Sequence, residues 1–211
     1  AVRALTGQAI TLENDGSLSL IIDSSDGDAR RLINIIEQLT PKSNHALSKK
    51  DIIKKAIQNA VEYELSQFNS VQEYVHGIDL SKQVHIGETG WSSVASDLYG
   101  YGGTEAADEY KLGLYYEMIT DVCVAKSISC FYFSAFDEPW KDSNNPEGSE
   151  NHFGLFTVDG KAKYALWDSV NDGLFKGLKR PNKIIKTFDG DLNALMETVY
   201  LPPVNVEDGH Q

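Results

Sequence analysis

Residues 128–136 read ISCFYFSAF, an almost unbroken apolar and aromatic run. Such a run is typical of a strand that is covered on both faces within a parallel sheet. A shorter apolar stretch, Val84–Gly87, precedes it, and a helical pattern over residues 105–126 lies between the two. A strand, a helix and a second strand in this order indicate a β/α architecture.

Helical patterns continue on both sides of this unit. Apolar residues recur at i, i+3 and i+4 from Ser48 to Gly77, which predicts one amphipathic helix in which a break would fall near Phe68. A last helix is predicted over residues 161–178, with a buried stripe that includes Leu174 and Leu178. We divide the chain into an N-terminal segment with a hairpin and a helix (1–47), a β/α part (48–180) and a C-terminal extension (181–211).

Composition excludes some classes of partner. The chain has 211 residues, with 19 Lys and Arg against 31 Asp and Glu, and a net charge of −12. We expect no nucleic-acid partner, because binding to phosphate requires clustered basic residues. We expect no membrane span either, because no apolar run reaches about 18 residues. The two cysteines, Cys123 and Cys130, are interpreted as free thiols rather than as a bridge or a metal site.

Glu88 is the first candidate for chemistry. It follows the apolar stretch that ends at Gly87 and stands close to Trp91. In (β/α) barrels the chemistry lies on loops at the carboxyl ends of the strands. A carboxylate beside a large aromatic ring suits sugar chemistry, since the ring can stack on a pyranose while the carboxylate meets the anomeric carbon. A surface Glu next to a half-buried Trp is the alternative at this point.

A second polar cluster follows the next predicted strand. It contains Glu138, Lys141 and Glu150, together with Trp140. Consecutive parallel strands are usually neighbours, so we expect this loop to lie beside Glu88, with Lys141 balancing the carboxylates and positioning sugar hydroxyls. An ordinary salt-bridged surface loop is the alternative. His152 lacks a second His at ligand spacing and is interpreted as a structural, hydrogen-bonded residue, so the sequence predicts no metal and no cofactor.

These motifs resemble a known family. Residues 86–93, IGETGWSS, resemble the ETGW-P-S segment that carries the nucleophile in glycoside hydrolase family 17, the β-1,3-glucanases, with Ser92 in place of the usual Pro. Residues 136–141, FDEPWK, with residues 150–156, ENHFGLF, are similar to that family's F-D-E-x-x-K … E-x-x-F/W-G-L-F segment. The two motifs stand in the right order over roughly residues 51–167.

The resemblance implies a retaining endo-acting β-1,3-glucan (laminarin-type) hydrolase on a (β/α)₈ TIM barrel, of which this chain is the C-terminal part. It implies β-1,3-glucan as the partner and no cofactor. Carried over residue by residue, Glu88 is the nucleophile on strand seven. Glu138, Lys141 and Glu150 form a supporting polar network, and Trp91 and Trp140 are candidate sugar platforms.

The acid/base Glu of the family lies in a Gly-Asn-Glu segment after strand four, and this sequence has no such segment. We therefore expect the C-terminal portion of a longer secreted or cell-envelope enzyme, completed by an N-terminal half or another copy and hydrolysing glucan poorly alone. Two alternatives stay open. One is a β-1,3-glucan transglycosylase, whose chemistry is the same until a sugar rather than water accepts the glycosyl unit. The other is a non-catalytic glucan-binding fragment.

Overall fold

The computed structural model describes residues 48–95 and 105–201, and within them Ile57–Tyr200 form one compact unit. The hairpin and helix predicted within residues 1–47 and the last part of the predicted C-terminal extension lie outside the described residues.

The first described helix is α4, Lys49–Ile78, which is continuous. Ser48 and Asp51 cap its start, because the Ser48 amide donates to the Asp51 carboxylate at 3.0 Å and the Asp51 amide donates to the Ser48 hydroxyl at 3.3 Å. Phe68 is buried within the helix, and the chain stays helical through it, so no break falls there. None of the helices in the described ranges is long and apolar enough to cross a membrane.

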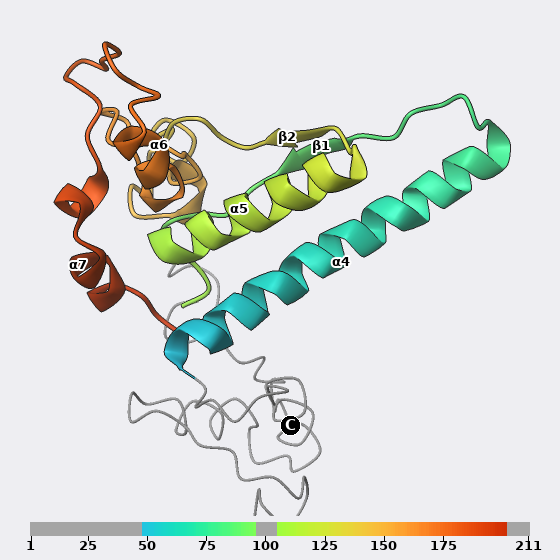
Figure 1. Cartoon of the computed structure of the whole chain (residues 1–211), viewed down its shortest axis with the longest axis horizontal. Coiled ribbons are helices and arrows are strands. Elements are labelled where there is room, and N and C mark those ends of the chain that lie inside the picture. The colour runs from blue at the N-terminus through green and yellow to red at the C-terminus, as the bar shows by residue number, and fades with distance from the viewer. Residues whose placement is uncertain (1–47, 96–104, 202–211) are drawn as a thin grey trace, which may run out of the picture. The chain divides into compact units, whose positions relative to one another are not determined.

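The predicted strand–helix–strand unit is present. Strands β1 (Ile86–Thr89) and β2 (Cys130–Tyr132) pair in parallel, and α5 (Glu109–Lys126) connects them. Figure 1 shows α5 alongside the two strands. The helix begins later than residue 105, because the Asp108 carboxylate caps it by accepting from the amide of Lys111 at 2.8 Å.

Both strands differ from their predicted bounds. The ladder begins only at Ile86, whose amide donates to Ser129, so β1 is shifted along the chain and includes Glu88. β2 ends at Tyr132 instead of continuing to residue 136. Tyr132 packs edge-on against Tyr116 of α5, but Phe131 is 62% exposed. The expectation of cover on both faces is therefore wrong for β2 among the described residues.

The predicted helix over residues 161–178 is much shorter. A 3₁₀ turn, Tyr164–Leu166, leads directly into α6, Trp167–Asn171, where the helix stops. Beyond it Gly173 and Gly177 have φ of 77° and 87°, a backbone that interrupts helical hydrogen bonding. Leu174 and Leu178 are consequently exposed rather than part of a buried stripe.

The start of the predicted C-terminal extension packs on this unit. The backbone of Ala162 bonds to Ile185 and Thr187, and Ala162, Leu166 and Ile184 form a buried apolar cluster. Two further 3₁₀ turns, Ser149–Asn151 and Thr187–Gly190, and the short helix α7, Leu192–Glu197, complete the described elements. Both cysteines are free, as predicted.

Candidate active site

A pocket of about 310 Å³ lies at the carboxyl ends of the two strands. It brings together three residues that the sequence singled out, Glu88, Lys141 and Glu150. The other residues that line it are Glu64, Thr89, Gly90, Tyr115, Phe133 and Phe153. Its wall therefore combines carboxylates and one ammonium group with aromatic rings.

The irregular register of β1 places Glu88 in this pocket. Ile86 pairs with Cys130 and Thr89 with Tyr132, so β1 has one more residue than β2 between the paired positions. Ile86 and Thr89 are both buried, whereas Glu88 between them is exposed. An extra residue of this kind redirects a side chain. The Thr89 hydroxyl lies 2.7 Å from the Tyr115 hydroxyl of α5, and this contact fixes the end of the strand.

Lys141 connects the charged and aromatic parts of the pocket wall. Its ammonium nitrogen is 3.6 Å from an Oε atom of Glu138 and 3.8 Å from the centroid of the Phe133 ring. The ion pair and the cation–π contact together hold the Lys141 side chain against Phe133, the residue that follows β2. Glu138 does not line the pocket itself, so it acts on the pocket through Lys141.

Asn151, which is 1% exposed, organises the loop that carries these groups. Its amide nitrogen donates to the carbonyl of Asp142 at 2.9 Å, and its amide oxygen accepts from the Asp142 backbone at 2.8 Å. Its own carbonyl accepts from the Glu138 amide at 3.0 Å. The bonds made by this one buried side chain and its backbone thus fix the loop between Glu138 and Glu150.

The two tryptophans are placed differently from the carboxylates. Trp91 is half-buried, its indole N–H donates to the carbonyl of Ala106 at 3.2 Å, and its ring centroid lies 5.1 Å from that of Tyr115. Trp140 is 63% exposed. Neither belongs to the described lining of the Glu88 pocket, so their role as sugar platforms stays a prediction.

A family model described as "Glycosyl hydrolases family 17" matches residues 45–167, more than half of the chain. The chain belongs to glycosyl hydrolase family 17. The match spans both sequence motifs, α4, the βαβ unit and the Glu88 pocket.

Two relatives agree with this family. A glucan 1,3-beta-glucosidase of Arthroderma benhamiae is 39% identical over 100 residues, which are 43% of this chain and 30% of that protein. The crystal structure of an endo-laminarinase from Formosa Hel1_33_131 matches with a TM-score of 0.71 and 41% identity, over 90% of this chain and 55% of that chain. The family 17 chain is therefore part of a (β/α)₈ barrel fold like that of its structural relative, and it spans about half of that relative's length.

Several pocket residues of the family 17 chain were not singled out from sequence. Phe133 and Phe153 meet with ring centroids 5.7 Å apart and form its aromatic wall. Phe133 belongs to the aromatic run of residues 128–136 and Phe153 to the second motif, so the sequence contained a signal for both rings. Glu64 comes from the middle of α4, and nothing in the helical pattern distinguishes it from Glu62 and Glu73 of that helix.

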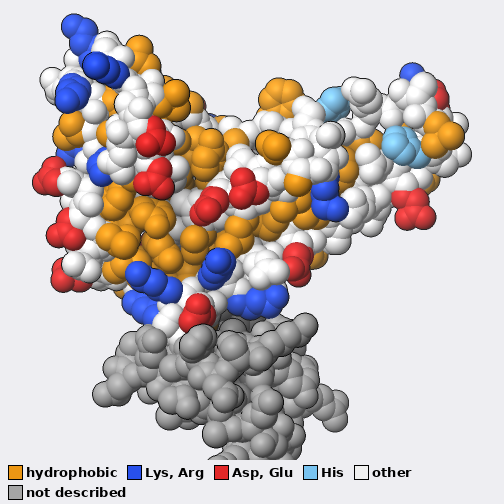
Figure 2. Space-filling model, viewed as in Figure 1, with side chains coloured by type: hydrophobic (Ala, Val, Ile, Leu, Met, Phe, Trp, Pro, Cys, Tyr) orange, Lys and Arg blue, Asp and Glu red, His pale blue; other side chains and the backbone are white. Residues whose placement is uncertain are grey.

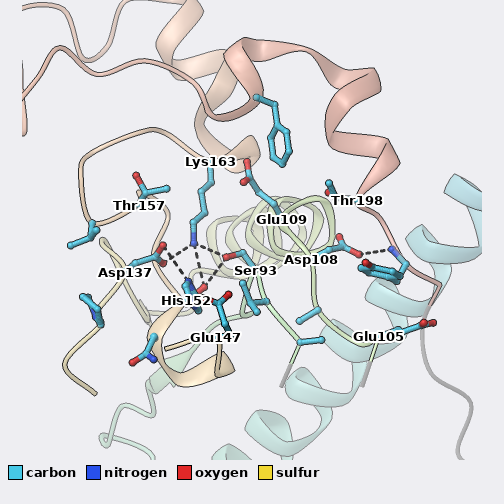
Figure 3. A pocket seen from close by; sticks show the side chains of 18 residues that line it. Ser93, Glu105, Asp108, Glu109, Asp137, Glu147, His152, Thr157, Lys163 and Thr198 are labelled. Carbon is cyan, nitrogen blue, oxygen red and sulfur yellow. Dashed lines mark hydrogen bonds and ion pairs between the residues drawn. The ribbon is translucent and has the colours of Figure 1, made fainter. Parts of the chain in front are cut away.

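A larger pocket of about 900 Å³ contains a second cluster of charged side chains. In Figure 3 Lys163 lies between Asp137, Ser93 and His152. Its ammonium donates to Asp137 Oδ1 and to Ser93 Oγ, both at 2.7 Å, and to the His152 carbonyl at 3.3 Å. Asp137 also accepts from the amide of Gly154 at 2.9 Å. The buried ion pair thus ties together the loops that follow β1 and β2.

Burial and charge set the pKa values in this cluster. Burial lowers the pKa of Lys163, although Asp137 opposes that shift. Burial raises the pKa of Glu109, which accepts hydrogen bonds from the Tyr164 amide and the Thr187 hydroxyl. The Asp137 carboxylate raises the pKa of His152, whose Nδ1 lies 3.8 Å from Asp137 Oδ2.

His152 is hydrogen-bonded, and its structural role stays a prediction. Its Nε2 lies 2.9 Å from the carbonyl of Pro146. In the described ranges no three His, Cys, Asp or Glu side chains are grouped so as to hold a metal ion. The hydrogen bonds and the ion pair of Lys163 connect loops of the protein itself. The Glu88 pocket holds Glu88, Lys141 and Glu150 together and is the candidate site for chemistry.

Proposed function

We propose that this chain carries the nucleophile of a retaining, endo-acting β-1,3-glucan hydrolase. Family membership and the two relatives, an endo-laminarinase and a glucan 1,3-beta-glucosidase by name, support this substrate class. The observation that carries the proposal is the meeting of Glu88, Lys141 and Glu150 in one pocket.

Glu88 is assigned as the nucleophile. Its carboxylate attacks the anomeric carbon, the bond to the departing sugar oxygen breaks, and a glycosyl ester forms on Glu88. Water later attacks the same carbon, which releases the sugar and restores the carboxylate. The exposure of Glu88 within the pocket supports this role, because an attacking carboxylate must reach the sugar.

Lys141, Glu138 and Glu150 are assigned as the supporting polar network. The Lys141 ammonium balances the negative charge of Glu138 and lies in the same pocket wall as Glu88 and Glu150. Ammonium and carboxylate groups in this position can bind sugar hydroxyls and orient the ring for attack. Trp91 and Trp140 are assigned as sugar platforms outside the pocket, and the rings of Phe133 and Phe153 provide stacking surface inside it.

The proposal assigns no acid/base carboxyl in this chain. Retaining hydrolysis needs a second carboxyl group about 5–5.5 Å from the nucleophile, which protonates the departing oxygen and then activates water. A test of Glu88 must therefore use a substrate whose leaving group departs without protonation. A 2,4-dinitrophenyl β-glycoside of laminaribiose meets this requirement.

The experiment measures dinitrophenolate release by the full chain and by two variants. We expect Glu88→Gln to lower release by roughly 10³-fold or more, since the amide cannot attack the anomeric carbon. Glu117→Gln makes the same charge change at an exposed position of α5 and should release dinitrophenolate like the parent. Mass spectrometry of the parent should show a glycosyl adduct on the peptide that contains Glu88.

Added azide identifies the role of Glu88. In Glu88→Ala, azide can occupy the vacated space and attack the anomeric carbon, which gives an α-glycosyl azide. A β-glycosyl azide would instead indicate that Glu88 serves as the acid/base group. Unchanged dinitrophenolate release in Glu88→Gln would remove this residue from the mechanism.

A further inference from the structure

A basic segment stands out on this acidic chain. Residues 173–186 read GLFKGLKRPNKIIK and contain no Asp or Glu, although the whole chain has a net charge of −12. Its cationic side chains are Lys176, Lys179, Arg180, Lys183 and Lys186. Figure 2 shows Lys and Arg side chains gathered with apolar side chains at the corner of the molecule where Figure 1 draws this segment in orange.

The segment is a fixed hairpin rather than a loose tail. Lys179 and Lys183 form an antiparallel bridge, and the amide of Arg180 donates to the carbonyl of Asn182 at 2.8 Å. Phe175 packs edge-on against Phe156 with 5.2 Å between ring centroids. These contacts hold the hairpin on the apolar cluster around Ala162.

Arg180 and Lys186 are committed to the protein itself. The Arg180 guanidinium lies 3.9 Å from the centroid of the Phe136 ring, and the Lys186 ammonium donates to Asn171 at 2.7 Å. Lys176, Lys179 and Lys183 are exposed, and none of them forms an ion pair with a described residue. One short segment thus carries three exposed lysines with no ion-pair partner among the described residues, in a chain that has an excess of carboxylates.

A groove of about 500 Å³ runs beside these lysines. Lys176, Lys183 and Lys186 contribute to its rim, with Asp189 as its acidic residue among the described lining. Apolar side chains, Val170, Phe175 and Ile184, form the rest of the wall. The groove shares no described lining residue with the Glu88 pocket, so it is a separate surface.

We infer that this groove binds an anionic polysaccharide, one that carries sulfate or carboxylate groups along a chain of pyranose rings. The unpaired lysines would meet the anionic groups, and the apolar wall would contact the less polar faces of the rings. A concave surface fits a flexible polymer better than it fits a flat lipid bilayer. The measured quantity is binding, so the inference stands or falls independently of the hydrolysis proposed for Glu88.

The test measures binding of the full chain to fluorescein-labelled dextran sulfate by fluorescence anisotropy, with uncharged labelled dextran of equal length as the reference polymer. We expect the chain to bind dextran sulfate and not uncharged dextran. The affinity should fall as the salt concentration rises, because binding releases counterions from the polymer and added salt makes that release less favourable. The variant K176Q/K179Q/K183Q should bind at least about tenfold more weakly, with a shallower dependence of affinity on salt. Thermal unfolding checks that the variant is folded.

A matched control carries the same loss of charge elsewhere. The variant K50Q/K54Q/K126Q neutralises exposed lysines on α4 and at the end of α5 and should bind like the parent. Equal weakening in both variants would indicate only a general charge effect and would overturn the inference. The absence of binding to dextran sulfate would also overturn the inference, as would binding to phosphatidylglycerol vesicles in its place. Self-association of the chain that is abolished in K176Q/K179Q/K183Q would overturn it too, because the groove would then be occupied by a second copy.

Discussion

At the scale of single residues, the register of the pairing between β1 and β2 decides whether the Glu88 side chain faces the pocket. The motif around Glu88 was readable from sequence, and its neighbours Lys141 and Glu150 were predicted to lie beside it. The register irregularity between Ile86 and Thr89 was not readable, because it depends on pairing with β2. The position of Trp91 was likewise unpredictable, since contacts distant in sequence, with Tyr115 and Ala106, determine it.

His152 gives a pH-dependent prediction at the same scale. The Asp137 carboxylate raises the pKa of His152 above its ordinary value of 6.5. Protonation is therefore favoured in the folded state, so the stability that His152 contributes is complete below about pH 6.5. That contribution is lost as the pH rises through the folded-state pKa.

We expect His152→Gln to lower the free energy of unfolding more at pH 5.5 than at pH 8.5, as measured by urea denaturation. A loss in His152→Gln that is equal at both pH values would contradict the assignment of the Asp137 contact.

At the scale of elements, the patterns over α4 and α5 predicted helices correctly and the pattern over residues 161–178 did not. The apolar stripes of α4 and α5 predicted both helices. In α4 the stripe is buried at Ile53, Ile57, Val61 and Phe68, and in α5 the first seven residues are buried on every side. The pattern over residues 161–178 failed, because Gly173 and Gly177 adopt positive φ and the chain turns away after Asn171. β2 is short because only Cys130–Tyr132 pair with β1. The apolar composition of residues 128–136 does not show how many of them pair.

The contact between β1 and the chain after β2 is tested by a pair of glycines. A Cβ atom on Gly90 would lie 2.0 Å from the carbonyl oxygen of Phe133, which is backbone and cannot rotate away. A Cβ atom on Gly87 would meet nothing within 4 Å. We expect Gly90→Ala to destabilise the fold by about 1–3 kcal/mol or more, and Gly87→Ala to cost much less.

Thermal or urea unfolding of the two glycine variants measures this difference. Because Gly90 also lines the Glu88 pocket, dinitrophenolate release should fall in Gly90→Ala as well. Equal stability of the two variants would mean that Gly90, the residue after β1, is not held as closely against Phe133 as described.

At the scale of the whole molecule, the family and its fold were identified from two motifs, while the acid/base group was not. The chain spans about half the length of the endo-laminarinase that it matches. General acid–base assistance typically contributes about 10²–10⁴-fold to such reactions. A chain that supplies the nucleophile without that assistance should therefore distinguish strongly between leaving groups.

We expect the 211-residue chain to release dinitrophenolate readily but to hydrolyse laminarin at least about 10²-fold less efficiently than a complete family 17 enzyme. Reducing-end assays on laminarin, run in parallel with the dinitrophenyl substrate, measure the ratio. Efficient hydrolysis of laminarin by the chain alone would show that one of its own carboxyl groups serves as acid and base. Glu64 and Glu150, which share the pocket with Glu88, would then be the first positions to substitute.

The buried Lys111 side chain has a consequence for where this protein can be shortened. Its ammonium donates to the Tyr200 carbonyl at 2.6 Å and to the carboxylate of Asp108, the residue that caps α5. Removal of the residues from Tyr200 onward would leave this desolvated cation with one acceptor fewer, right at the helix start. A truncation meant to isolate the barrel portion should therefore keep Tyr200. Proteolysis that removes Tyr200 should destabilise the fold, beginning at the amino end of α5.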